Sequence, residues 1–527
     1  MSGHSALLVE KLWQLKRRID KGACPGVEFV HLNALLREPG YRSDVLRRVA
    51  SKGSPEMQTL VREIQANDTG EPLTAKSRDA VLAATPESRR AAKRSWLGRN
   101  TLLALPVVSV AIAAVAGFTA FEHRAIRIQS DIVSDTVWKT GNRYILEETV
   151  FVDGATLTIE PGVTIEGENG SALIVTRDSH LFARGQVDRP IVFTSSQPEG
   201  KRQRGDWGGV VLLGKAPVNQ PDAAIEGLQE GDARGRFGGT DATHSCGVIE
   251  YTRIEFAGFE VYRDNELNGL TLGGCGSNTI VRNVQVHRAL DDGIELFGGT
   301  VDLKNIVVSG AADDSIDWDW GWTGRVQFAV IQQHPDVGDN AFEGDNNGDD
   351  HNATPRSEPT FYNVTLAGAG LAAKQHRGMV IREGSGGHFH NLLIDSYAIE
   401  AVDTRDQVAP LVHSNTLSFS NNLLANTGSL GRGPDEAGSS DDDHGFDESQ
   451  WLRLPGHDNN IRLESALHSA ARDLSSPSFA PRVQLRQMHA TPPPQSEFFD
   501  ESAVFQGAIN PLARRSWLTG WTAFPEA

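Results

Sequence analysis

Acidic residues recur at a fixed interval in the middle of the chain. The segment Asp291-Asp-Gly-Ile-Glu-Leu-Phe297 returns 22 residues later as Asp313-Asp-Ser-Ile-Asp-Trp-Asp319. After an insertion, Asn340-Ala-Phe-Glu-Gly-Asp345 repeats the same pattern. If these segments stack on one another, they place carboxylates in columns. Such columns could hold a divalent cation or supply paired carboxyl groups for acid–base chemistry.

Alignment of the repeats predicts three columns of side chains. The first column contains Asp292, Asp314 and Asn340. The second contains Glu295, Asp317 and Glu343, and continues with Val380 and Glu400. The third contains Phe297, Asp319, Asp345 and Arg382. Ile294, Ile316 and Phe342 have the opposite parity to the second and third columns. Because side chains alternate along a strand, the apolar set is expected inside and the acidic columns on the outer face.

Stacked carboxylates repel one another. At a coil spacing of about 4.8 Å, two carboxylates repel by roughly 3 kcal/mol at an effective dielectric of about 20. Ca²⁺ accepts irregular sets of oxygen ligands and would relieve this repulsion. The predicted metal ligands are Asp292, Glu295, Asp314, Asp317, Asp319, Glu343 and Asp345. The alternative is a solvated acidic face that keeps a long sheet soluble.

Two catalytic roles are compatible with this face. In a cation-assisted polysaccharide lyase, Arg382 would take the C5 proton of the uronate sugar. In a glycoside hydrolase, the paired carboxyl groups would come from Asp317, Asp319 and Glu343. The structural alternative for Arg382 is a salt bridge to Asp345. The sequence shows no Ser-His-Asp arrangement and no nucleotide-binding fingerprint in its proper context.

The repeat also predicts the architecture. Asn283-Val-Gln-Val286, Asn305-Ile-Val-Val308 and Asn363-Val-Thr-Leu366 form a second repeated strand, with a period of 22 between the first two. Coils of this length cannot bury an apolar face alone and must stack on their neighbours. We therefore expect an all-β, right-handed parallel β-helix over residues 130–527, with long loops at 214–246 and 425–497.

Several segments resemble a largely uncharacterised family of bacterial β-helix proteins that are secreted or anchored to the membrane. The matching segments are Trp138-Lys-Thr-Gly-Asn-Arg-Tyr144, Leu157-Thr-Ile-Glu-Pro-Gly-Val163, Gly205-Asp-Trp-Gly-Gly-Val-Val211, Glu266-Leu-Asn-Gly-Leu-Thr-Leu272, Asp291-Asp-Gly-Ile-Glu-Leu-Phe297 and Trp517-Leu-Thr-Gly-Trp-Thr522. The resemblance covers nearly all of residues 130–527. It implies the β-helix fold and says little about function.

An apolar run separates a basic head from an acidic body. Residues 101–121 contain no charged side chain, a length that spans a bilayer as one helix. Residues 1–100 carry a net charge of +7 and the remainder −25. Five basic residues precede the run, which predicts a signal anchor with a cytoplasmic N-terminus. We expect a small helical segment at 1–65, a polar linker at 66–100 and an extracytoplasmic β-helix beyond the anchor.

The charge composition of the body argues against nucleic acid as a partner. The acidic body lacks the clustered Lys and Arg that bind nucleic acid. We therefore expect an inner-membrane protein that presents a cation-stabilised β-helix to polysaccharide or envelope material, with a head able to dock a cytoplasmic protein. A carbohydrate-active enzyme and a structural spacer or adhesin are the alternatives.

Two cysteines lie in the acidic body. Cys246 and Cys275 either form a disulfide between adjacent coils or remain two buried thiols.

Overall fold

The computed structural model describes residues 39–66, 124–228, 231–262, 265–373, 376–432 and 443–526, with a few single positions between residues 11 and 68. The chain divides into two compact units, residues 1–118 and 119–527. The predicted anchor at residues 101–121 lies outside the described residues and stays a prediction. Within the described ranges, no helix is long and apolar enough to cross a membrane.

The first unit has a small helical core. Helix α3 (Pro39–Lys52) is followed by α4 (Pro55–Gln65), whose first turn is capped by the Ser54 hydroxyl. Its apolar core includes the buried side chains of Leu12, Leu15, Ile19, Val45, Leu46, Val49, Leu60, Val61 and Ile64. The Arg42 guanidinium pairs with Asp68 at 2.8 Å. Burial of one helical face is what holds so short a segment together.

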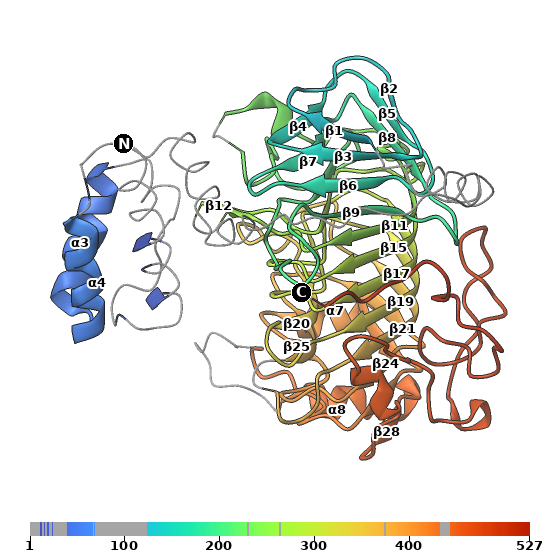
Figure 1. Ribbon diagram of the computed structural model, residues 1–527. Coiled ribbons are helices and arrows are strands. Elements are labelled where there is room, and N and C mark those ends of the chain that lie inside the picture. The colour runs from blue at the N-terminus through green and yellow to red at the C-terminus, as the bar shows by residue number, and fades with distance from the viewer. Residues whose placement is uncertain are drawn as a thin grey trace, which may run out of the picture. The chain divides into compact units, whose positions relative to one another are not determined.

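The second unit is a parallel β-helix, and one of its walls is a sheet of nine parallel strands (Figure 1). Its strands, in spatial order, are β4 (Thr149–Val152), β7 (Ala172–Val175), β10 (Val210–Leu213), β14 (Leu270–Gly273), β16 (Ile294–Phe297), β18 (Ile316–Asp319), β20 (Asn340–Gly344), β22 (Arg377–Ile381) and β25 (Asp403–Thr404). Ile294 pairs with Ile316, and Ile316 with Phe342, so their side chains stack inside the core. The predicted parallel β-helix is confirmed.

The remaining walls form one sheet of seventeen strands. It contains β1 (Arg124–Ile128), β2 (Thr136–Trp138), β3 (Asn142–Leu146), β5 (Thr156–Ile159), β6 (Thr164–Gly167), β8 (His180–Arg184), β9 (Ile191–Ser195), β11 (Gly247–Glu255), β15 (Ile280–His287), β17 (Asp302–Ser309), β19 (Arg325–Gln332), β21 (Thr360–Ala367), β23 (Gly387–His390), β24 (Leu393–Asp395), β26 (Leu417–Ser420), β27 (Leu423–Ala425) and β28 (Asn460–Arg462). Strand β1 pairs with β3, so strand pairing begins at Arg124, six residues before residue 130.

Asparagine residues mark a sharp bend in this sheet. Asn283, Asn305, Asn363, Asn391 and Asn421 all have φ between 54° and 59°. Asparagine enters this left-handed region more readily than most residues because its short amide bonds locally. The bend turns each coil into two strand segments that face different directions. This conformation is the physical reason for the Asn residues that open the repeated strands in the sequence.

The C-terminal segment leaves the coils after β28 and runs back over the bend (Figure 1). The Asn363 amide donates to the carbonyls of Ala503 (2.9 Å) and Phe505 (2.6 Å), and the Asn391 amide donates to Thr491 (2.7 Å). Residues 463–526 therefore form a strap over the seventeen-stranded sheet and add no coils. The strap uses the polar groups that the bend turns outward.

A short helix closes the last coil. Phe361, Phe389 and Phe419 stack through the core with ring centroids 5.2 and 6.2 Å apart. Trp451 of α8 (Glu448–Leu452) continues the stack at 6.2 Å from Phe419. A second helix, α7 (Val408–His413), lies between β25 and β26. Capping of this kind shields the last apolar layer from water.

Cys246 and Cys275 form a disulfide. Both residues are fully buried, Cys246 just before β11 and Cys275 just after β14. Of the two alternatives that the sequence left open, the structure has the bonded one. The bond joins two residues with a sequence separation of 29, and the segment between them contains β11, the β12–β13 hairpin (Glu260–Tyr262 and Asn265–Glu266) and β14.

Burial of Glu448 in the capping helix predicts that the stability of the β-helix depends on pH. Glu448 is buried, accepts a bond from the Thr404 hydroxyl at 2.8 Å, and burial raises its pKa to about 8. Since the unfolded value is about 4.3, this group favours the folded state fully below about pH 4 and loses that contribution as the pH rises through about 8. We expect Glu448→Gln to flatten the fall in melting temperature between about pH 5 and about pH 9.

Thermal unfolding followed by circular dichroism at several pH values measures this effect. Glu148→Gln is the matched control because Glu148 is exposed. Equal pH dependence in Glu448→Gln and the wild type would contradict the prediction.

Candidate functional site

The turns that enter β16, β18 and β20 carry a ladder of hydrogen bonds. The backbone N–H of Asp292 donates to Asn268 Oδ1 (3.2 Å), that of Asp314 to Asp292 Oδ1 (2.8 Å), and that of Asn340 to Asp314 Oδ1 (2.6 Å). Asp292 and Asp314, two side chains of the first predicted column, therefore each accept the N–H of the next coil, as Asn268 does before them. Asn268 extends the column upstream and was not identified from the sequence. These bonds satisfy buried N–H groups and give the column a structural role.

The second column points outward from the same strands. Glu295 pairs in register with Asp317, and Asp317 with Glu343. Ile316 and Trp318 on either side of Asp317 are fully buried in the core. The alternation predicted from the sequence thus places these carboxylates outside the apolar core.

The carboxylates of the first and second columns are largely shielded from water, although those of the second column point outward. Burial, followed by repulsion from neighbouring carboxylates, raises the pKa of each of four groups well above its usual range: Asp292, Glu295, Asp314 and Asp317. The Asp314 and Glu343 carboxyls hydrogen-bond to each other, which requires a proton between them. This face differs from a solvated acidic surface, the alternative that the sequence left open.

Three of the predicted ligands converge. Asp292, Glu295 and Asp317 each offer a carboxylate oxygen, and these oxygens all lie within 4.8 Å of one another. We call these three residues the carboxylate cluster. Asp317 Oδ1 is inaccessible to water and has no hydrogen-bond partner. An unsatisfied, buried carboxylate oxygen fits a cation ligand, because its desolvation is otherwise uncompensated.

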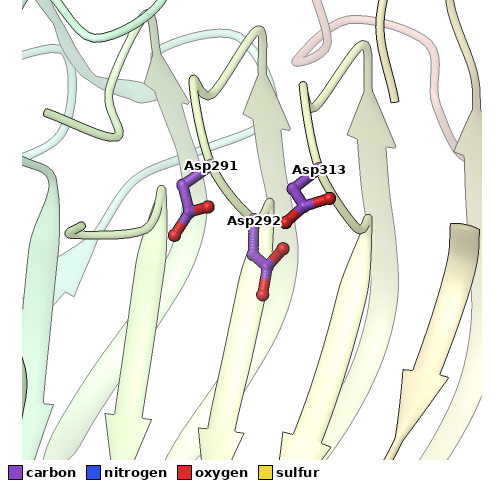
Figure 2. Close-up of side chains that lie close together, drawn as sticks. All are labelled: Asp291, Asp292 and Asp313. Carbon is purple, nitrogen blue, oxygen red and sulfur yellow. The ribbon is translucent and has the colours of Figure 1, made fainter. Parts of the chain in front are cut away.

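A second group adjoins the first. Asp291, Asp292 and Asp313 also bring one oxygen each within 4.8 Å, at the turns before β16 and β18 (Figure 2). Asp292 belongs to both groups. Asp291 and Asp313 were not selected from the sequence, although each precedes a predicted ligand in the repeated Asp-Asp pair. The repeated Asp-Asp pair is the sequence pattern from which Asp291 and Asp313 could have been predicted.

The third column ends in an ion pair. The Arg382 Nε donates to Asp345 Oδ1 at 2.9 Å, and its Nη2 contacts both Asp345 and Glu343. Burial alone would lower the pKa of Arg382, but these two carboxylates raise it above its usual range. The salt bridge weighed as the structural alternative for Arg382 is present. A guanidinium held in this way is a poor proton acceptor.

Asp319 lies beside the long loop at residues 214–246. Burial raises its pKa to about 8, while the Trp320 N–H, donated at 2.5 Å, opposes the shift. Trp320 packs on Phe297 and Phe237, with ring centroids 4.7 and 6.0 Å away. The loop therefore packs apolar side chains on the outward residues of β4, β7, β10 and β16 and on Trp320, the residue after Asp319.

The register of the later coils differs from the sequence alignment. Val380 pairs with Asp403, so Glu400 does not continue the second column. Glu400 instead lies beside Arg377, whose Nε donates to it at 3.1 Å. The insertions between these coils vary in length, and the alignment misplaced Glu400 by three positions. Asp403, which takes the expected place, is also paired with Arg377 at 3.1 Å.

A family model described as a pectate-lyase-like β-helix domain matches residues 130–447, more than half of the chain. The chain belongs to this family. The match covers all three acidic columns and ends at residue 447, immediately before the capping helix α8. No curated protein and no solved structure matches the chain. Membership of the family agrees with the stacked coils and assigns no role to the carboxylates.

The ladder of Asp292 and Asp314 predicts a contrast between two substitutions. Asp314→Ala leaves the Asn340 N–H without its acceptor and should lower the free energy of unfolding by about 1–3 kcal/mol. Asp314→Asn keeps an acceptor oxygen and removes a like charge, so it should change stability little or increase it. Urea denaturation in the presence of EDTA measures both, and equal destabilisation by Asn and Ala would refute the ladder's structural role.

Proposed function

We propose that this protein is an extracytoplasmic, carbohydrate-binding β-helix whose carboxylate cluster holds a divalent cation, with Ca²⁺ as the best fit. The observation that carries the proposal is the buried, unpartnered Asp317 Oδ1 among oxygens of Asp292 and Glu295. The pectate-lyase-like family is compatible with a carbohydrate ligand. A cation shared between the protein and an acidic or hydroxyl-rich glycan would join the two functions.

The compartment is also a proposal. The Cys246–Cys275 disulfide is typical of proteins in oxidising surroundings. The apolar run at residues 101–121 and the basic residues before it favour an inner-membrane anchor with the head in the cytoplasm. Together they support a periplasmic or surface-exposed β-helix in a bacterium, and a head available to a cytoplasmic partner.

A second candidate is acid-catalysed glycoside hydrolysis. Asp319, with its pKa raised to about 8 by burial, would remain protonated at neutral pH, as a general acid must. Asp345 lies close enough to raise that pKa further, and burial also raises the pKa of Asp345, although its ion pair with Arg382 opposes the rise. A glycosidase needs one protonated and one ionised carboxyl group, and Asp319 and Asp345 are the candidates for these two roles.

Calcium binding is tested on the full-length protein by thermal unfolding and titration calorimetry. Calcium at about 100 times its dissociation constant should stabilise the protein by about 2.7 kcal/mol, and EDTA should reverse the gain. Asp317→Ala should abolish the calcium-dependent gain. Glu250→Gln is the control, since Glu250 lies on the other sheet and pairs with Arg282 at 2.7 Å. An unchanged melting temperature on adding calcium or EDTA would overturn the cation proposal.

Ligand class is tested with neutral and acidic polysaccharides under the same conditions. Binding that requires calcium and is lost in Asp317→Ala supports the proposal. Release of reducing ends that is lost in Asp319→Asn would favour the hydrolase, and unsaturated products would favour a lyase. Binding that survives both EDTA and Asp317→Ala would remove this face from consideration.

The compartment is tested by thiol labelling of protein denatured directly from cells. Cys246 and Cys275 should react with a maleimide only after reduction. Cys24, a free cysteine, is the internal control and should react in both cases. Labelling of all three without reductant would place the β-helix in a reducing compartment.

A further inference from the structure

The outer face of the seventeen-stranded sheet carries a second set of reactive side chains. Strands β21, β23 and β26 lie in register, with Thr360 opposite His388 and His388 opposite Ser418. Phe389 and Phe419 point into the core, so His388 and Ser418 point outward. This face belongs to a different sheet from the carboxylate cluster.

His388 bridges a hydroxyl and a carboxylate. Its Nδ1 lies 2.8 Å from Ser418 Oγ, and its Nε2 lies 3.0 Å from Glu358 Oε1. An ionised carboxylate can only accept, so Nε2 carries the ring proton of the neutral imidazole. Nδ1 then presents its lone pair to the Ser418 hydroxyl. A base aligned with a nucleophile and oriented by a third group is the arrangement that activates serine.

The next row of the same sheet provides an internal comparison. His390 Nδ1 lies 3.0 Å from Ser420 Oγ, but the described residues place no carboxylate on its other nitrogen. Its ring stacks on Tyr362 with centroids 4.8 Å apart, and burial lowers its pKa to about 4. His–Ser pairing is thus shared by two rows of this face, whereas the carboxylate is found only in the row of His388.

The side chains of the first row are accessible. The His388 side chain is 24% exposed and that of Glu358 38% exposed. Ser418 is partly exposed on the same face. These exposures would let a substrate attached to a large or extended molecule reach the row.

We propose that Ser418, His388 and Glu358 form a nucleophilic triad that hydrolyses carboxylic esters carried on an extended substrate, such as acyl groups on a polyhydroxyl chain. Ser418 Oγ attacks the ester carbonyl carbon while His388 Nδ1 takes the hydroxyl proton. His388 returns that proton to the leaving alkoxide, which departs as an alcohol and leaves an acyl-serine. Water then attacks the acyl-serine, gives its proton to His388, and releases the carboxylic acid as Ser418 recovers its proton.

Reaction with a fluorophosphonate tests the nucleophile, with the full-length protein and mass spectrometry of the modified peptide. The probe should modify Ser418 and leave Ser420 unmodified. Glu358→Gln should slow labelling at least tenfold, because the imidazole then loses its charged orienting partner. Ser420→Ala is the matched control and should label like the wild type. Absence of label at Ser418, or an equal rate in Glu358→Gln, would overturn the proposal.

A second variant guards against loss of folding. Ser418→Cys keeps a small nucleophile at the same place, and its reaction with iodoacetamide at neutral pH should be at least tenfold faster than that of Ser420→Cys. Hydrolysis of p-nitrophenyl acetate by the wild type should fall to background in Ser418→Ala. Equal thiol reactivity at the two positions would show that the His388 row only packs the sheet.

Discussion

Each coil of the β-helix lies in register on the coil before it, and this constraint determines where every functional side chain can lie. Ile294, Ile316 and Phe342 stack because the apolar core tolerates no shift by one residue, which would turn them outward. The same register places Glu295, Asp317 and Glu343 above one another. The concentration of negative charge is therefore a consequence of the repeat, and the protein must manage it.

It manages the charge in three ways along the same sheet. Backbone N–H groups bind Asp292 and Asp314, so part of each carboxylate is used structurally. Arg382 neutralises Asp345 at one end of the column. In the centre, where Asp317 keeps an oxygen without a partner, protons or a cation must supply the missing positive charge. The proposed cation site lies where the protein's own compensation is missing.

The other sheet uses its register differently. Its bend exposes Asn amides, and the C-terminal strap binds them, so that 60 or so residues without coils still have a defined place. Further along, the outward positions hold His388 and Ser418 instead of charged groups. The two sheets of one solenoid thus present two chemically distinct faces, one acidic and one with a hydroxyl next to an imidazole.

The period of the sequence was sufficient to predict a β-helix, the inward set of Ile294, Ile316 and Phe342, and the acidic columns, because strand alternation and a fixed coil length act locally. The period was insufficient to predict the register of the later coils, because the insertions between those coils vary in length. Glu400 was assigned to the wrong column for that reason. Only the tertiary structure showed that the outward carboxylates are shielded from water, since burial depends on neighbours that lie far away in sequence. Likewise, Glu358, His388 and Ser418 follow one another at intervals of 30 residues, and only the tertiary structure brings them together.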